Sequence, residues 1–321
     1  MDSRKSTDIR SILEHFLARD RVTDLFLSPG GVSYDQGSGI EFHGVTLEES
    51  ALRTWVVQTI TQLGKAYDAK VPYVDFIFPL GTIQIRGHAF FPPCSPQMEV
   101  SLRFLRTPPV DSGWTTDPYF PLLYDRFQNA QSILLCGSTG SGKTTLARIL
   151  LSGLPEKNRI IALEDTPELH VAHPGFLSLR TREANADGFG EIRLKDLLRQ
   201  TLRMRPDRIV LGECRGDEVL ELLQVLNTGH AGSTATLHAN SCREALKRIE
   251  LLVLMHPRGG QMTIKAIREL ILSGIQWIAH LKRDSEGRRR IAEVCAVAGI
   301  EGETLLLRPE RLASREALVI G

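Results

Sequence analysis

The sequence has almost no net charge, no long apolar run and no export signal. Lys and Arg number 39 against 38 Asp and Glu, so the formal net charge is +1. This balance provides no overall field that would gather nucleic acid, and we expect no nucleic-acid partner. No stretch of 18 uncharged apolar residues occurs, so we expect no helix that spans a membrane. Residues 1–10 carry five charged residues and no apolar core, so we expect no secretory signal.

Cysteine pairs are also missing. The five cysteines form no Cys-x-x-Cys motif and are widely separated, at Cys94, Cys136, Cys214, Cys242 and Cys295. Their spacing argues against a disulfide framework and against a cysteine zinc site, and it is typical of a protein from a reducing cytosol. Hydrophobic residues make up 42% and charged residues 24%, the profile of an ordered globular protein.

The length and the placement of proline predict two domains joined by a linker. Residues 1–108 combine helical stripes with short alternating runs, as in a small α+β domain. Strands are expected at 22–27, 74–78, 82–89 and 100–106. Thr46 followed by Glu49 predicts a capping box at the start of a helix. Residues 109–125 hold Pro109, Pro118 and Pro121, so we expect an extended interdomain linker.

Residues 126–321 alternate predicted strands and helices, which indicates a parallel sheet covered on both faces. The strands are expected at 132–136, 160–163, 208–211 and 233–238. The stretch 278–307 predicts an antiparallel hairpin that turns at 285–287. We interpret the basic residues of this hairpin as solvated charges, with an anionic lipid or an acidic partner as the alternative. They are Lys282, Arg283, Arg288, Arg289 and Arg290.

A phosphate-binding loop is the strongest chemical signal. The motif G-x-x-x-x-G-K-[ST] is matched by Gly137, Ser138, Thr139, Gly140, Ser141, Gly142, Lys143 and Thr144, with Thr145 next. An apolar run precedes the loop and a helical pattern follows it, which is the context that the motif requires. The glycines let backbone N–H groups face phosphate, and the helix N-terminus adds positive partial charge. Lys143 is expected to reach the β- and γ-phosphates, and Thr144 to hold Mg²⁺.

Acidic groups follow two later predicted strands. Glu213 ends an apolar run and is the candidate that activates water or holds the metal shell. Gly212 stands where many P-loop proteins have a metal-binding aspartate, so Mg²⁺ is expected to bind through Thr144, waters and more distant acids. Glu164 ends the strand at 160–163. Carboxyl ends of parallel strands share one edge, so we expect Glu164 to assist Glu213 in catalysis and in holding Mg²⁺, partly through water.

The segment 227–241 is polar and rich in glycine, with two histidines and no other ionisable residue. Neutral polar side chains suit a sensor of the γ-phosphate. We expect His230 to donate a hydrogen bond to phosphate or to relay to Glu213, and His238 is the second candidate. Metal binding by the two histidines is a competing interpretation, although no third ligand is evident. A structural turn is another.

Together these motifs resemble the secretion ATPase superfamily, which drives type II secretion, type IV pili, archaeal flagella and type IV secretion. Residues 137–144 match its Walker A loop, 161–169 its Asp box, 202–216 its Walker B region and 228–241 its His box. The sequences of these motifs are most similar to those of the CpaF-type ATPases of Tad (Flp) pili, and conjugation ATPases are a close alternative. The four-cysteine zinc module usual in the type II branch is absent from the sequence, as is most of the CpaF N-terminal extension.

The resemblance implies an α/β fold class, with a RecA-like P-loop NTPase domain and a smaller N-terminal α+β (PAS-like) domain. It implies ATP and Mg²⁺ as cofactors and a homo-hexamer in the cytoplasm. The hexamer is expected at the inner face of the inner membrane, held there by pilus platform proteins. By position, Arg86 and Arg103 match arginines that the N-terminal domain donates to the nucleotide. Arg199, Arg203 and Arg215 are candidates for sensing nucleotide or joining subunits.

Three other functions stay open. A nucleic-acid motor lacks support because basic and aromatic residues do not interleave. A switch GTPase or small-molecule kinase is disfavoured because no Asn/Thr-Lys-x-Asp motif occurs. A regulator without hydrolysis is disfavoured because all the motifs keep their chemical groups.

Overall fold

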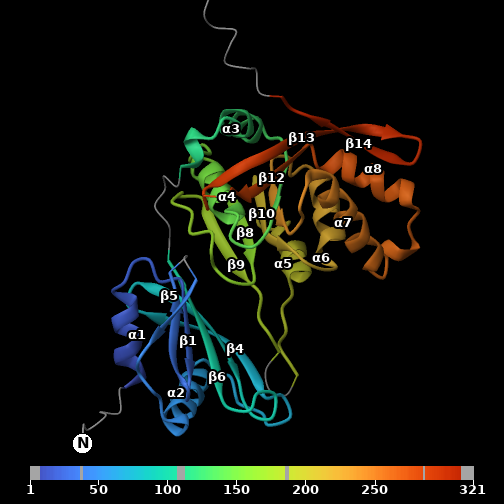
Figure 1. Ribbon diagram of the computed structural model, residues 1–321. Helices are drawn as coiled ribbons and strands as arrows, with labels where there is room; N and C mark the ends of the chain where they lie inside the picture. The colour runs from blue at the N-terminus through green and yellow to red at the C-terminus, as the bar shows by residue number, and fades with distance from the viewer. Residues whose placement is uncertain (1–7, 37–38, 107–112, 185–187, 285, 312–321) are drawn as a thin grey trace, which may run out of the picture. The chain divides into compact units, whose positions relative to one another are not determined.

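The computed structural model describes residues 8–36, 39–106, 113–184, 188–284 and 286–311. The chain divides into two compact units (Figure 1). Unit 1 comprises Met1–Thr107 and Glu183–Glu191, and unit 2 comprises Pro108–Arg182 and Ile192–Gly321. The segment Glu183–Glu191 therefore belongs with unit 1, although the sequence analysis assigns it to the 126–321 domain. Within unit 1, Lys65 forms an ion pair with Glu183 of this segment.

Unit 1 is built on an antiparallel sheet of six strands among its described residues, in the order β3–β2–β1–β6–β5–β4. The strands are β1 Asp24–Ser28, β2 Gly31–Asp35, β3 Ile40–His43, β4 Tyr73–Leu80, β5 Ile83–Phe90 and β6 Glu99–Leu105. Buried residues alternate with more exposed ones along β1 and β2, because successive side chains point to opposite faces. One face of the sheet is therefore apolar.

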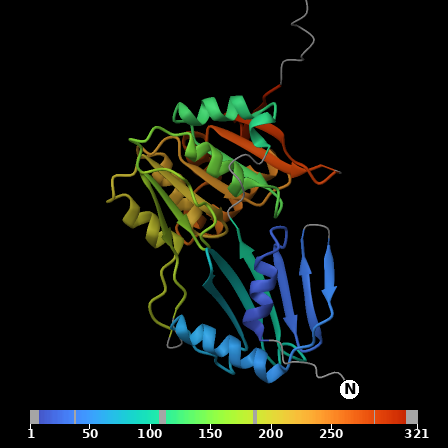
Figure 2. The same ribbon diagram turned by 90° about the vertical axis from the view of Figure 1, so that its left-hand side faces the viewer.

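Two helices cover that face (Figure 2). α1 Ile9–Leu17 and α2 Glu49–Gln62 share one core with the sheet, since Phe16, Val56 and Leu102 belong to the same buried cluster. The predicted capping box is wrong. α2 begins at Glu49 after Glu48, and no side chain caps it within the described residues, because Thr46 lies before the N-cap position.

Unit 2 contains an eight-stranded sheet among its described residues, in the order β14–β13–β12–β7–β11–β10–β8–β9. Its strands are β7 Ile133–Gly137, β8 Ile160–Glu164, β9 Phe176–Arg180, β10 Arg208–Cys214, β11 Thr234–Leu237, β12 Trp277–Arg283, β13 Arg289–Glu301 and β14 Thr304–Pro309. The strands from β12 to β9 are parallel, whereas β13 and β14 extend the sheet in antiparallel fashion. The predicted parallel sheet is confirmed. The stretch 278–307, predicted as one antiparallel hairpin, forms two, because β13 pairs with β12 and also with β14. The predicted turn of that hairpin includes Ser285, which lies outside the described residues.

Helices pack on both faces of this sheet (Figure 1). They are α3 Phe120–Gln128, α4 Lys143–Ser152, α5 Leu194–Thr201, α6 Glu218–Leu226, α7 Cys242–Met255 and α8 Ile264–Gly274. α3 and α4 share a core with Leu135, and α5 to α8 share a second core with Leu134. Neighbouring residues of one strand point to opposite faces, so the two cores lie on opposite sides of the sheet. None of the described helices has the length and apolarity needed to cross a bilayer.

The stretch expected to be an extended linker is folded where the structure describes it. Residues 107–112 lie outside the described part. Trp114–Thr116 form a short 3₁₀ helix, and α3 begins at Phe120, so the prediction of an extended chain is wrong here. Trp114 is 1% exposed and belongs to the core with α3 and α4. Pro121 is compatible with α3 because it occupies the first turn, where a backbone N–H has no partner within the helix.

Candidate nucleotide-binding site

The phosphate-binding motif lies between β7 and α4, at the carboxyl edge of the parallel strands. Gly137, Gly140 and Gly142 have φ angles of 154°, 73° and 96°, in the region that favours glycine. A Cβ on Gly137 would lie 2.3 Å from the carbonyl oxygen of Leu281, and one on Gly142 would lie 2.7 Å from the ring of Trp114. Glycine is therefore required here both by the backbone angles and by the close neighbours.

Lys143 and Ser141 supply polar groups within this loop. Nζ of Lys143 donates to the carbonyl oxygens of Gly137 at 2.9 Å and of Ser138 at 3.0 Å. Burial lowers the pKa of Lys143, and the charge of Glu213 opposes that shift. The Oγ atom of Ser141 is buried and has no hydrogen-bond partner among the described residues. An amine and an unpartnered hydroxyl at a helix N-terminus fit a phosphate group.

The tip and the end of the loop differ in exposure. Ser138, Thr139 and Gly140 are exposed, whereas Thr144 and Thr145 are half-buried in the first turn of α4. The loop is therefore open to solvent at its tip, where a polyphosphate can enter. The Thr144 hydroxyl sits at the start of the helix, as its predicted role in holding Mg²⁺ requires.

Two arginines of the β12–β13 hairpin bind the tip of the loop, which the sequence analysis did not foresee. Nε of Arg283 and Nε of Arg289 donate to the carbonyl oxygen of Gly140 at 3.0 Å and 3.3 Å. Burial and the charge of Arg283 lower the pKa of Arg289. The hairpin reaches the loop because β12 pairs with β7, which places Leu281 opposite Gly137. The only signal in the sequence was the cluster of basic residues.

Glu213 lies at the carboxyl end of β10 and contacts Arg215 and His238. Nη2 of Arg215 donates to Oε2 of Glu213 at 2.5 Å, and Nε2 of His238 lies 3.1 Å from Oε1. β11, which precedes His238, pairs with both β7 and β10. This strand order brings the phosphate loop, Glu213 and His238 to one edge of the sheet.

The surrounding charges keep Glu213 ionised. Burial raises the pKa of Glu213, but Arg215, His238 and Lys143 outweigh burial and lower it below its ordinary value of 4.5. Burial and the charge of Lys143 lower the pKa of His238 below its ordinary value of 6.5, against the attraction of Glu213. At neutral pH the centre therefore combines an ionised carboxylate with a neutral imidazole.

Glu164 ends β8, and its carboxylate holds the segment that follows. Oε1 accepts hydrogen bonds from the backbone N–H groups of Glu168 at 2.9 Å and Leu169 at 3.0 Å. Oε2 accepts from Oγ of Ser178 at 2.7 Å, and the residue is 3% exposed. A Cβ on Gly212 would lie 3.3 Å from Cγ of Glu164, which explains why a small residue precedes Glu213. These contacts favour a positioning role for Glu164 over direct metal binding.

His230 does not join this centre. It precedes β11, whereas His238 follows it, so the two histidines lie at opposite edges of the sheet. The four residues of β11 alone span about 13 Å at 3.3 Å per residue. Nδ1 of His230 lies 3.4 Å from the carbonyl oxygen of Val225, in the turn after α6. The predicted relay from His230 to Glu213 is therefore wrong, and so is the paired-histidine metal site; His238 contacts Glu213 instead.

The remaining predicted arginines fall into two groups. Arg86 and Arg103 are cross-strand neighbours on β5 and β6 of unit 1, and Nε of Arg103 donates to Oδ1 of Asp24 at 2.8 Å. In unit 2, only Arg215 of the three Walker B arginines has a described contact with Glu213. Arg199 pairs with Glu221 of α6 at 2.8 Å, and Arg203 donates to Gln200 at 3.2 Å.

Comparison with known proteins relates this chain to secretion proteins. Residues 92–301 match the model of the family described as type II/IV secretion system protein. A protein of Mycobacterium tuberculosis provisionally assigned to conjugal transfer is 37% identical over 303 residues, which cover 91% of this chain and 85% of that protein. VirB11 of the Bartonella quintana type IV secretion system is 40% identical over 183 residues, which cover 57% of this chain and 51% of VirB11.

A solved structure supports the same fold. The crystal structure of the pilus retraction motor PilT with bound ADP matches with a TM-score of 0.66 at 22% identity, covering 89% of this chain and 82% of PilT. The predicted RecA-like fold with an N-terminal domain is confirmed, and so is the prediction of a secretion ATPase. Since the family model covers more than half of the sequence, this chain belongs to the type II/IV secretion system protein family.

Proposed function

We propose that this chain is a Mg²⁺-dependent ATPase that acts as a homo-hexameric motor in a secretion or conjugation system. The observation that carries the proposal is the contact of Glu213 with Arg215 and His238 at the sheet edge that also bears the phosphate loop. Hydrolysis of a phosphoanhydride requires an oriented water and a group that takes its proton. An ionised carboxylate beside a phosphate loop meets both requirements.

The loop fits ATP and Mg²⁺. The space at Gly137 and Gly142 admits no side chain, so the backbone itself can line the phosphates, and Oγ of Ser141 is an unpartnered donor. Thr144 would hold Mg²⁺, with Glu213 acting through water. When bound, Mg²⁺-ATP supplies the γ-phosphoryl group and the charge neutralisation for its transfer.

Each polar side chain of the site has a distinct proposed role. Lys143 exchanges the carbonyl oxygens of the loop for oxygens of the β- and γ-phosphates. Glu213 accepts a hydrogen bond from the attacking water and takes its proton. Arg215 and His238 fix the orientation of the Glu213 carboxylate from two sides. Glu164 is a positioning residue that holds the backbone after β8.

The arginines of unit 1 are proposed to complete the site. Arg86 and Arg103 are cross-strand neighbours, so their guanidinium groups can act together on the charge that develops on the γ-phosphate. If Arg103 releases the Asp24 carboxylate and binds the γ-phosphate instead, nucleotide binding would be coupled to the position of unit 1. We propose that movement of unit 1 relative to unit 2 turns hydrolysis into displacement. The motor would act in the cytoplasm, held at the inner membrane by partner proteins.

Within this class we assign the motor to assembly of a Tad (Flp)-like type IV pilus, with retraction as a second phase. The amino-acid sequence of residues 202–209 and 227–230, which is similar to that of the CpaF-type ATPases, supports this assignment. Conjugal transfer is the second candidate, favoured by the 37% identical relative. Deleting the gene and scoring surface pili and plasmid transfer separates the two. Lost pili with normal transfer supports the first, and lost transfer with normal pili supports the second.

Phosphate release from Mg²⁺-ATP, measured against protein concentration, tests the enzyme assignment. We expect specific activity to rise with concentration, because subunits must assemble to complete each site. Glu213→Gln should lower turnover about 100-fold or more, the usual contribution of a general base. Glu269→Gln, which changes an exposed carboxylate on α8, is the matched control and should retain wild-type activity. Full activity in Glu213→Gln would refute the assignment of the catalytic acid.

A further inference from the structure

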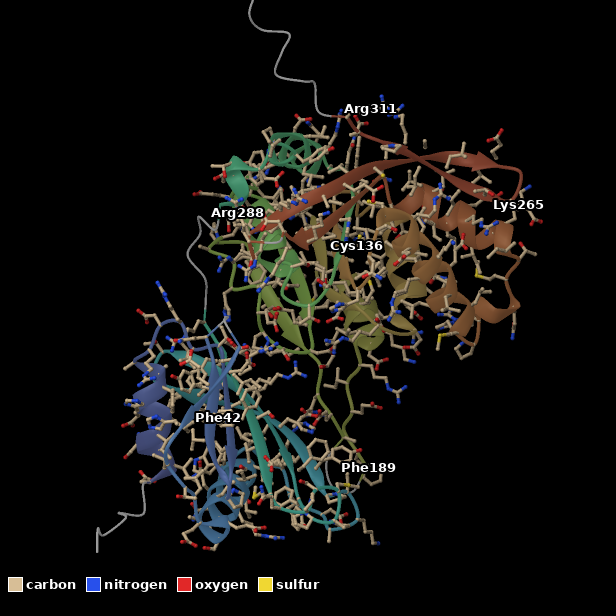
Figure 3. The ribbon with its side chains drawn as sticks, viewed as in Figure 1. Phe42, Cys136, Phe189, Lys265, Arg288 and Arg311 are labelled. Carbon is tan, nitrogen blue, oxygen red and sulfur yellow. The ribbon has the colours of Figure 1, made fainter. Side chains whose placement is uncertain are left out.

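Three cysteines that are distant in sequence converge in unit 2, on the face of the sheet covered by α5 to α8. Cys136 is the next-to-last residue of β7, Cys242 is the first residue of α7, and Cys295 lies on β13. All three belong to one buried core, and Figure 3 labels Cys136 among the side chains of unit 2. Sγ of Cys242 donates to the carbonyl oxygen of Ile278 at 3.5 Å, and Sγ of Cys136 to that of Ser241 at 3.7 Å. A cluster of thiols in an apolar core calls for a chemical explanation.

A carboxylate completes this cluster. Oε1 of Glu293 accepts a hydrogen bond from Sγ of Cys295 at 3.4 Å, and Oε2 accepts one from the backbone N–H of Cys242 at 3.0 Å. That N–H lies at the N-terminus of α7, so the helix end orients the carboxylate toward the thiols. Glu293 is half-buried, whereas Cys242 and Cys295 are buried, so the carboxylate is the part of the cluster that solvent reaches.

We infer that Cys242, Cys295 and Glu293 form a binding site for one Zn²⁺ ion. The sulfurs of Cys242 and Cys295 and one carboxylate oxygen of Glu293 lie within 4.8 Å of one another. Ligand atoms around tetrahedral zinc, with bonds of about 2.0–2.3 Å, lie about 3.5–3.8 Å apart. Movements of about 1 Å or less would therefore close the site around the ion.

The donor set favours zinc over harder cations. Thiolate sulfur selects soft and borderline ions, whereas Mg²⁺ and Ca²⁺ prefer sites made of oxygen ligands. A reactive-thiol role fits less well, because Cys242 and Cys295 are buried and buried structural thiols are inert. His280 lies opposite Glu293 on β12 and adds an imidazole beside the carboxylate. Zinc would join α7 to β13.

Zinc binding to the full chain tests this site directly. The protein is purified with a phosphine reductant, stripped of metal, and titrated with Zn²⁺ against a chromophoric chelator. We expect one tightly bound ion per chain. Cys295→Ser and Glu293→Gln should each weaken binding by about 10–100-fold or more, the cost of disturbing even outer partners of a metal. Cys214→Ser, at a buried cysteine of β10 outside the group of ligand atoms, should bind zinc like the wild type.

A second measurement keeps the test valid if a variant fails to fold. Co²⁺ bound to the wild-type chain should give a thiolate-to-metal charge-transfer band, which Zn²⁺ abolishes by displacement. No stoichiometric zinc in the wild type, no such band with Co²⁺, or equal binding in folded Cys295→Ser would each overturn the inference. A Cys242–Cys295 disulfide, detected by mass spectrometry in protein isolated without reductant, would also overturn it.

Discussion

Replacing Glu164 separates a positioning role from a direct part in the reaction. Glu164→Gln keeps the shape of the side chain and one acceptor oxygen for the N–H groups of Glu168 and Leu169. The Ser178 hydroxyl, which now donates to Oε2, can rotate and accept from the new amide nitrogen. The variant should therefore preserve the loop that follows β8 while it removes the negative charge.

The expected losses follow from these hydrogen bonds. Bonds to charged groups contribute about 1.5–3 kcal/mol and neutral ones about 0.5–1.5, so weakening the two bonds in Glu164→Gln should cost about 2–3 kcal/mol. Glu164→Ala leaves two backbone N–H groups without partners at about 1–3 kcal/mol each, a total of about 2–6 kcal/mol. At about 2–4 °C per kcal/mol for a unit of this size, the fall in Tm should be about 4–12 °C for glutamine and about 4–24 °C for alanine.

The assay compares Tm and ATP turnover in the same preparations. A positioning residue predicts that Glu164→Gln retains turnover within about threefold, whereas Glu213→Gln loses about 100-fold or more. Ser178→Ala, which removes only the partner of Oε2, is the matched control. It should lower Tm, because a buried carboxylate oxygen loses its partner, and should retain turnover within about threefold. A Glu164→Gln protein with wild-type Tm and about 100-fold slower turnover would refute the reasoning and place Glu164 at the reacting atoms or the metal.

Three further predictions concern the edge of the sheet around the phosphate loop. Because the pKa of His238 is lowered from 6.5, the unfolded form binds more protons near that pH. Stability should therefore hold above pH 6.5 and fall below it, whereas turnover should fall only as the pH passes the lowered pKa of the folded protein; denaturant melts of His238→Gln should lose this dependence. Gly137→Ala should abolish nucleotide binding, measured by calorimetry, since its Cβ would meet the Leu281 carbonyl oxygen at 2.3 Å; normal affinity would contradict the tight loop. Arg283→Gln removes a donor to the loop and should raise the Kd for ATP about tenfold in the same calorimetric measurement, the usual effect of losing a hydrogen bond from a charged group. An unchanged Kd would show that Arg283 is a solvated surface charge with no part in nucleotide binding.

The sequence alone determined the local parts of the site. A glycine loop between an apolar run and a helical pattern fixes its own backbone, so residues 137–144 and the helix that follows could be predicted without a fold. Glu213 could be found in the same way, as an acid that ends an apolar strand. These signals are local because the backbone angles and the burial of a short segment are encoded by its own residues.

Only the tertiary structure decided which side chains meet. His230 and His238 look alike in the sequence, but β11 separates them, and its pairing with β7 and β10 delivers His238 to Glu213. The same strand order brings Arg283 to the loop and joins cysteines whose spacing gave no sign of a metal site. Strand order follows from packing apolar faces across the whole unit, so the hydrophobic pattern of one segment does not predict which strands will pair with it.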